Sequence, residues 1–218
     1  MTSREIILNK LRNSTKQAFP STQKAPASYV PVTQLGQESL ISRFTAELER
    51  LTGKVYVVDD AQAAAETVIR IVGEDTSVLG WEALHVHALY EAFSSKGITV
   101  IVPEVRGDDR ARVLNELGKV RVGITGADAA FATTGTLAVV AQPGQARLPS
   151  LLPSVHVALL SRDHLYPTME SWLNEAGSHA LRNSRSVTFI TGPSRTSDIE
   201  MQTILGVHGP REIHVVIF

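Results

Sequence analysis

The chain has 218 residues, is 43% hydrophobic and carries a formal net charge of -1 at pH 7, which predicts a globular protein with one main core and no broad attraction to nucleic acid. It contains no cysteine, which excludes disulfides, thiolate nucleophiles and cysteine-ligated iron-sulfur clusters from this chain. No apolar run approaches the roughly 20 residues that span a bilayer, and no secretory signal pattern opens the sequence, so we expect a cytoplasmic protein without a membrane span.

The first part of the chain is predicted to be an arm. Residues 3–19 have apolar side chains at helical spacing and predict an amphipathic helix. Residues 19–31 contain three prolines, which cannot sustain a helix and favour an extended linker. We therefore divide the chain into an N-terminal helical arm with its linker, residues 1–35, and an α/β domain, residues 36–218. The arm packs either on its own domain or on a partner.

From about residue 38, short runs rich in β-branched residues alternate with longer helical patterns. The expected helices cover residues 38–52, 61–72, 84–96, 108–118, 166–176 and 198–205, and the expected strands cover residues 54–58, 76–80, 98–102, 120–124, 155–160, 187–191 and 213–218. This alternation indicates βαβ units and a mostly parallel sheet with helices on both faces. The right-handed crossover rule leaves an open α/β/α sandwich as the simplest fold.

Two glycines refine this assignment. Gly53 follows the helix expected over residues 38–52 and is a suitable left-handed stop for it. Gly135 interrupts residues 128–141, which favours two short strands that meet near Thr134–Thr136 over a helix.

Three turns rich in glycine and hydroxyl groups are expected at strand ends: residues 123–128, 133–136 and 191–196. In open α/β sheets, ligands bind beyond the carboxyl ends of strands. If the turns converge, they offer donors to an anionic or carbonyl-bearing ligand. The alternative is that each turn only meets the conformational needs of a tight connection. The predicted ligand-binding residues are Thr134, Gly135, Thr136, Gly192, Ser194, Arg195, Thr196 and His208.

The segment TGPSRTSDIE, residues 191–200, combines two patterns. Ser197 and Glu200 have capping-box spacing and predict the start of a helix. Arg195 is the best ligand candidate of the preceding turn, because its planar guanidinium suits a carboxylate or a phosphate. The alternative for Arg195 is a salt bridge to Asp198 or to a neighbouring acid.

The sequence offers only weak candidates for catalytic residues and for metal ligands. Asp128 and Glu200 are the nearest candidates for catalysis, but Asp128 also suits a turn residue that bonds its own backbone, and Glu200 suits a helix cap. His85 and His87 are two residues apart and do not share a helix face, so we predict no metal site. His156 lies in an apolar run and is interpreted as a hydrogen-bonded core or edge residue.

Three segments carry a resemblance to a known family: TGPSRTSDIE at 191–200, GVHGPREIHV at 206–215 and ADAAFATTGTL at 127–137. Together they resemble the LUD-domain family, specifically its lactate-utilisation protein C (LutC/YkgG-like) group. The resemblance covers most of the chain from about residue 55. It implies a fold like the NagB/RpiA/CoA-transferase α/β/α sandwich and a role in oxidising L-lactate to pyruvate. It also implies partner proteins that hold the iron-sulfur clusters, with no cofactor in this chain.

Three functions follow as hypotheses. The leading one is a non-redox, cluster-free component of an iron-sulfur L-lactate-oxidising system, which binds a small anionic or carboxylate ligand, a partner protein, or both. The alternative is an independent enzyme of this fold that acts on a phosphorylated sugar, folate or CoA-like substrate. A third is a structural or regulatory interaction module. Relatives of the fold use acidic catalytic residues, but no matching motif assigns such a role here.

Overall fold

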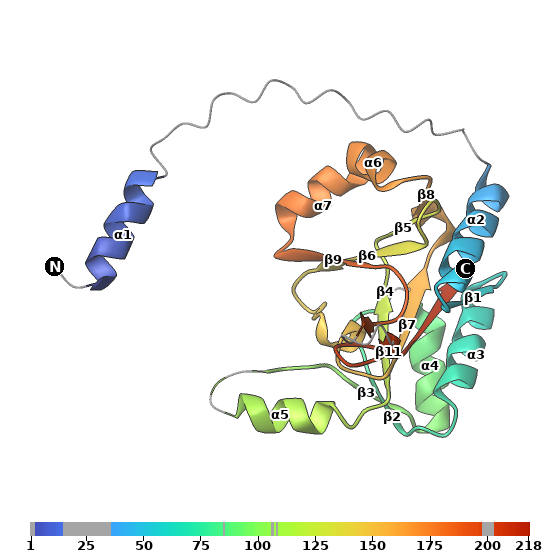
Figure 1. Cartoon of the computed structure of the whole chain (residues 1–218). Helices are drawn as coiled ribbons and strands as arrows, with labels where there is room; N and C mark the ends of the chain where they lie inside the picture. The colour runs from blue at the N-terminus through green and yellow to red at the C-terminus, as the bar shows by residue number, and fades with distance from the viewer. Residues whose placement is uncertain (1–2, 15–35, 85, 106, 108, 198–202) are drawn as a thin grey trace. The chain divides into compact units, whose positions relative to one another are not determined.

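The computed structural model describes residues 3–14, 36–84, 86–105, 107, 109–197 and 203–218 (Figure 1). The chain forms two compact units, residues 1–33 and 34–218. The described part of the first unit is α1 (Ser3–Ser14), so the helix predicted from residue 3 is present, and residues 15–19 lie outside the described residues. None of the described helices has the length and apolar character needed to cross a membrane.

The centre of the second unit is a six-stranded sheet in the order β1-β12-β7-β4-β2-β3. Its strands are β1 (Lys54–Val57), β2 (Ser77–Leu79), β3 (Thr99–Ile101), β4 (Val122–Gly126), β7 (Val155–Leu160) and β12 (Glu212–Ile217). Every neighbouring pair is parallel. The mostly parallel sheet that the alternating pattern predicts is therefore confirmed.

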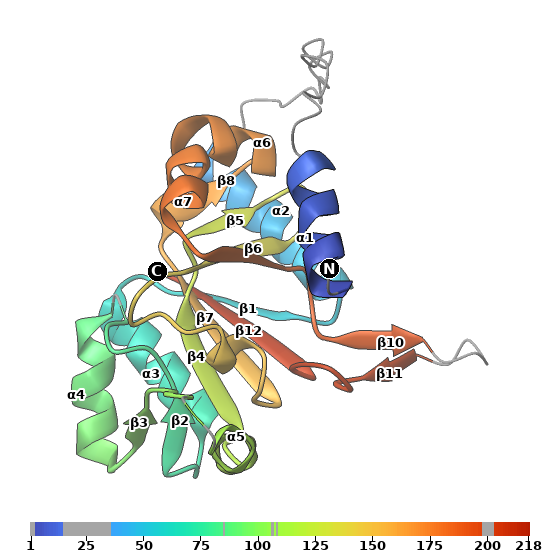
Figure 2. The ribbon, with the colours of Figure 1, turned by 90° about the vertical axis from the view of Figure 1, so that its left-hand side faces the viewer.

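Helices cover both faces of this sheet. They are α2 (Gln37–Arg50), α3 (Ala61–Val72), α4 (His87–Lys96) and α5 (Arg110–Leu117). Val78 packs in the cluster that includes α3 and α4, whereas the next residue, Leu79, packs in the cluster that includes α5, because successive strand side chains point to opposite faces. Figure 2 shows α3 and α4 on one side of β2 and α5 on the other. The α/β/α sandwich is confirmed.

A second, four-stranded sheet has the order β8-β5-β6-β9. Its strands are β5 (Ala129–Phe131), β6 (Thr136–Ala141), β8 (Leu165–Tyr166) and β9 (Ser186–Ile190), and α6 (Met169–Trp172), the π-helical turn Leu173–Gly177 and α7 (Ser178–Asn183) pack on it. The antiparallel pair β5 and β6 confirms the two short strands predicted on either side of Gly135. The helix expected over 166–176 starts later, because Leu165 and Tyr166 pair with β5.

The helix expected over 198–205 is wrong where the structure describes it. Thr203–Leu205 form β11, which pairs antiparallel with β10 (Arg195–Ser197). Ser197 thus lies in a strand, so it does not begin a helix that continues through residue 205. The cross-strand pairing outweighs the local capping pattern. Asp198 and Glu200 lie outside the described residues.

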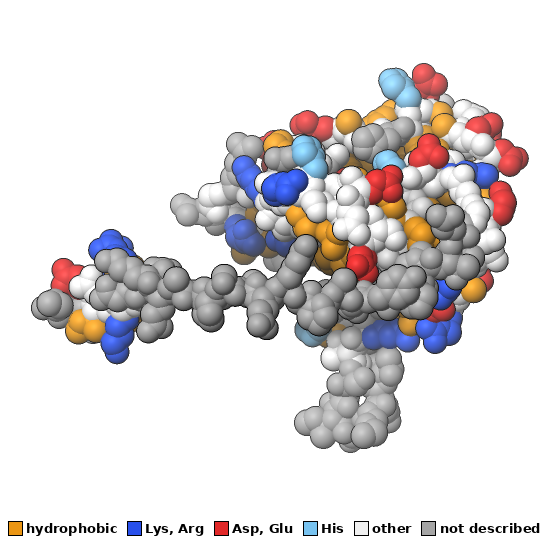
Figure 3. All heavy atoms as spheres, turned by 90° about the horizontal axis from the view of Figure 1, so that it is seen from above, with side chains coloured by type: hydrophobic (Ala, Val, Ile, Leu, Met, Phe, Trp, Pro, Cys, Tyr) orange, Lys and Arg blue, Asp and Glu red, His pale blue; other side chains and the backbone are white. Residues whose placement is uncertain are grey.

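The surface of the second unit is mixed. Figure 3 shows acidic and basic side chains on one face of it, with hydrophobic side chains between them. This agrees with the near-neutral net charge of -1.

Candidate ligand-binding site

A cavity of about 640 Å³ lies where the main sheet and the second sheet meet. It is lined by Glu82, Val102, Pro103, Glu104, Val105, Ala141, Gln142, Pro143, Gly144, Gln145, Ala146, Arg147, Arg185 and Ser186. Glu82 follows β2 and Val102 follows β3, so the cavity opens beyond the carboxyl ends of two parallel strands. This is the position at which open α/β sheets bind ligands.

The loop after β6, residues 142–147, forms one wall and is held in place by hydrogen bonds. The backbone N–H of Gln145 donates to the Gln142 carbonyl at 2.9 Å. The indole N–H of Trp81 donates to the Ala146 carbonyl, also at 2.9 Å. Gly144 has a φ of +78°, and a Cβ there would lie 3.3 Å from the Glu82 carboxylate, so a glycine suits this position.

Tyr90 holds the opposite connection, between β2 and α4. Its hydroxyl accepts a hydrogen bond from the Leu84 N–H at 2.8 Å and donates to the Trp81 carbonyl at 3.0 Å. Burial raises the pKa of the Tyr90 hydroxyl, which keeps it protonated and able to donate. The walls of the cavity are therefore held by hydrogen bonds of the buried Trp81 and the half-buried Tyr90.

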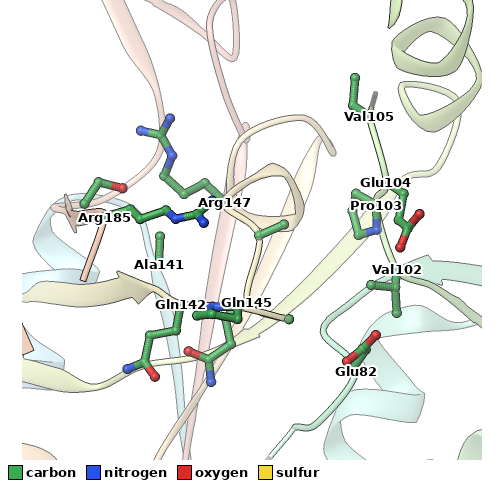
Figure 4. Close-up of a pocket in the computed structure, with 14 residues that line it drawn as sticks. Glu82, Val102, Pro103, Glu104, Val105, Ala141, Gln142, Gln145, Arg147 and Arg185 are labelled. Carbon is green, nitrogen blue, oxygen red and sulfur yellow. The ribbon is translucent and has the colours of Figure 1, made fainter. Parts of the chain in front are cut away.

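Basic and acidic side chains lie on opposite sides of the cavity. Figure 4 shows Arg147 and Arg185 on one side, and Glu82 and Glu104 on the other. Among the described residues, neither arginine has an ion pair or a side-chain hydrogen bond. The Oε1 atom of Gln145 is buried and has no partner among the described residues. The arginine side can therefore bind an anion.

The second and third predicted turns come together. The Thr134 hydroxyl lies 2.7 Å from the Thr136 hydroxyl, which lies 2.9 Å from the Thr191 hydroxyl. Gly135 has a φ of +62°, and a Cβ there would lie 2.7 Å from the Leu48 backbone nitrogen. The three hydroxyls and the glycine thus lie close to the carboxyl-terminal turn of α2.

The third predicted turn meets the same end of α2. The Arg195 guanidinium donates to the Leu51 carbonyl and to the Thr52 hydroxyl. At Gly192, a Cβ would lie 2.9 Å from the Leu51 Cβ. Arginine commonly satisfies the last carbonyls of a helix. The alternative predicted for Arg195, an ion pair with Asp198, lies outside the described residues.

The left-handed residue after α2 is Thr52, with a φ of 69°. The prediction that Gly53 takes this conformation is wrong. A Cβ at Gly53 would lie 2.6 Å from the Leu48 Cγ, so close packing against the helix explains the glycine.

The other predicted site residues lie elsewhere. An oxygen of the Asp128 carboxylate accepts the Val140 N–H of β6 at 2.8 Å, a longer-range bond than the predicted one to its own backbone. Thr196 lies within β10, and the Ser194 N–H donates to the Pro210 carbonyl at 2.9 Å. His208 lines a different cavity, at the amino ends of the main strands. The ligand-binding roles of these residues remain predictions.

Sequence reasoning missed the cavity residues Arg147, Arg185, Glu82 and Gln145. The carboxyl-end rule applied to β2 and β3 would have indicated Glu82 and the segment 102–105. The binding turns were instead predicted from their content of glycine and hydroxyl groups, and this criterion led to turns of the second sheet. No pattern along the chain connects Arg147 with Arg185, because they are brought together by the pairing of β6 with β9.

Residues 41–218 match the family model of the LUD domain. Three curated relatives are each named lactate utilization protein C. The protein from Exiguobacterium sp. is 41% identical over 99 residues (44% of this chain, 43% of that protein), and the one from Halalkalibacterium halodurans is 34% identical over 110 residues (49% and 48%). The protein from Bacillus pumilus is 23% identical over 195 residues (84% and 80%). The matched segments thus cover less than half the length of the first two relatives.

A solved structure has a similar fold. It is the crystal structure of a DUF162 family protein from Deinococcus radiodurans, with a TM-score of 0.65 and 20% sequence identity, and the match covers 84% of this chain and 98% of that one. At this identity the likeness concerns the fold alone.

Proposed function

Because the chain belongs to the LUD-domain family, we propose that it is a non-redox component of a system that oxidises L-lactate to pyruvate. The names of its relatives, lactate utilization protein C, support this proposal. The chain has no cysteine, so cysteine-ligated iron-sulfur clusters of such a system would be held by partner proteins.

The ligand of the proposed function is a small carboxylate, L-lactate or pyruvate, in the cavity beyond β2 and β3. The observation that carries this assignment is the pair Arg147 and Arg185, two guanidinium groups on one side of the cavity without a described partner. A guanidinium binds a carboxylate through two parallel hydrogen bonds. The carboxylate would lie on the arginine side of the cavity.

Glu82 and Glu104 determine how a carboxylate ligand would be oriented in the cavity. They lie on the side opposite the arginines and repel a carboxylate there. A monoanion is thus directed to Arg147 and Arg185 in one orientation. In this proposal the chain binds and orients the acid, and electron transfer belongs to the cluster-holding partners.

The size of the cavity favours a second candidate. A volume of about 640 Å³ is larger than a three-carbon acid fills. An independent enzyme acting on a phosphorylated sugar, folate or CoA-like substrate would use this volume more fully. Saturable turnover of such a substrate by the isolated protein, lost in Arg147→Ala, would favour this candidate over the first.

Genetic complementation tests the leading proposal. A strain that lacks this chain should grow poorly on L-lactate as sole carbon source and normally on glucose. The natural chain and the surface variant Arg43→Ala should restore growth, whereas the double variant Arg147→Ala, Arg185→Ala should not. The natural chain should also copurify with proteins that contain iron-sulfur clusters. Normal growth of the deletion strain on lactate, with no such association, would sink the proposal.

A further inference from the structure

A second cavity, of about 520 Å³, lies at the opposite end of the main sheet. It is lined by Gly118, Lys119, Val120, Arg121, Leu151, Leu152, Pro153, Ser154, Gly206, Val207, His208, Gly209 and Arg211. Arg121, Ser154 and Arg211 directly precede β4, β7 and β12, so the cavity lies at the amino ends of these strands. No acidic residue is among the lining residues, although the chain as a whole is slightly acidic.

The loop Gly206–Arg211 is held at both ends by backbone hydrogen bonds. The Gly206 N–H donates to the Ser194 carbonyl at 2.9 Å, and the Pro210 carbonyl accepts the Ser194 N–H at 2.9 Å. The Arg211 N–H donates to the Ser154 carbonyl at 2.8 Å. Between these anchors, the backbone N–H groups of residues 207–209 have no acceptor among the described residues.

Gly206 makes room for the Arg211 side chain. It has a φ of +77°, and a Cβ there would lie 1.9 Å from the Arg211 Cγ. The stem of Arg211 therefore lies directly across Gly206, which places the guanidinium group beside the loop. Consecutive free N–H groups in a glycine-containing turn, with a guanidinium beside them, are the donors that a phosphate group requires.

Two of the cationic side chains that line this cavity already have acidic partners. Lys119 is paired with Glu116 at 2.9 Å, and Arg121 is paired with Asp75 at 2.7 Å. Arg211 has no carboxylate partner among the described residues, and the exposed His208 has none either. The uncompensated positive charge of this cavity is thus that of Arg211.

We propose that the loop Gly206–Arg211 binds the phosphate group of a small-molecule ligand, at a site separate from the carboxylate cavity. Arg211 and the N–H groups of residues 207–209 bind the phosphate oxygens. The exposed side chains of Leu151 and Val207 contact the apolar part of the ligand. This site does not depend on the proposed role in lactate oxidation.

Titration of the ¹⁵N-labelled full chain tests the site. Inorganic phosphate and glycerol phosphate are added at constant ionic strength, balanced with chloride. We expect saturable shifts of the amide signals of residues 207–209. Arg211 is exposed, and Arg211→Gln should weaken phosphate binding about tenfold or more, which is the loss expected for a charge-assisted hydrogen bond. Arg211→Lys keeps the positive charge and should recover part of the lost affinity. Tighter binding of glycerol phosphate would identify an ester, and equal binding would identify free phosphate as the sufficient ligand.

One control keeps this result separate from the other cavity. Arg185→Ala should leave the phosphate response unchanged, and failure of the lactate proposal would not alter it. Equal binding by the natural chain and Arg211→Gln, absence of saturable shifts, or an acetate response as strong as the phosphate response would each overturn the proposal.

Discussion

His156 is a fully buried titratable residue of β7. Its Nε2 atom lies 2.9 Å from the Thr125 hydroxyl, and its Nδ1 atom has no partner among the described residues. Burial, with a smaller effect of the nearby His214, lowers the pKa of His156 from 6.5 to about 4. The ring is therefore neutral in the folded protein at neutral pH, as expected of the core histidine that the sequence indicated.

This burial makes stability depend on pH. Above pH 6.5 the ring is neutral in both the folded and the unfolded state, so it contributes no difference. As the pH falls from 6.5 towards 4, the unfolded state takes up a proton that the folded state does not, and the free energy of unfolding decreases. At pH 4.5 this loss is about 2–3 kcal/mol for the natural chain.

Urea denaturation at pH 7 and pH 4.5 measures this loss. The natural chain should lose more stability between the two pH values than His156→Gln, which has no group that titrates in this range at position 156. The control Arg43→Ala, at an exposed position of α2, should show the same loss as the natural chain. An equal pH dependence of His156→Gln and the natural chain would contradict the assignment of the loss to the buried ring.

The sequence indicated that Arg195 binds a ligand. In the structure its guanidinium instead donates to groups at the carboxyl-terminal end of α2. Its bonds to the Leu51 carbonyl and the Thr52 hydroxyl should contribute about 1 kcal/mol to stability, since the side chain is exposed. Arg195→Ala should lower the free energy of unfolding by this amount. The control Arg43→Ala, which replaces an arginine on α2 itself, should change the free energy of unfolding little. If Arg195→Ala leaves stability unchanged and abolishes ligand binding, the ligand role first predicted for Arg195 is the correct one.

At the scale of elements, the turn between β5 and β6 fixes the second sheet against α2. Gly135 has positive φ and lies against the Leu48 backbone, so Gly135→Ala combines conformational strain with a steric clash. Gly97, which ends α4, is left-handed with a φ of +67°, but an added Cβ there would meet nothing within 4 Å, so Gly97→Ala carries the strain alone. Gly97→Ala should cost about 1–2 kcal/mol of stability, and Gly135→Ala at least twice as much. Equal losses in thermal or urea unfolding would show that the approach to α2 has no energetic effect.

The elements differ in how well the sequence predicted them. The helix Ala61–Val72 was predicted to the residue, because its apolar spacing and the Asp60 cap are both local signals. The strand Thr203–Leu205 was predicted as helix, because its pairing with β10 is not visible in a local pattern. The cavity residues were missed for the same reason, since Arg147 and Arg185 meet only after β6 and β9 have paired.

At the scale of the whole second unit, the parallel sheet separates two sites. The cavity proposed to bind a carboxylate lies beyond the carboxyl ends of β2 and β3, and the proposed phosphate loop lies at the amino ends of β4, β7 and β12. Because all six strands run in one direction, the two sites occupy opposite ends of the same sheet. Substitutions at one site should therefore leave ligand binding at the other unchanged, apart from effects on folding.

Calorimetric titration of the isolated chain with L-lactate and pyruvate tests the central claim most directly. The natural chain and Arg43→Ala should bind at least one of the two acids with equal affinity. Arg147→Ala and Arg185→Ala should each weaken that binding about tenfold, because each removes a charge-assisted hydrogen bond to the carboxylate. Binding that is unchanged in both variants, or no binding of either acid by the natural chain, would contradict the assignment of the cavity.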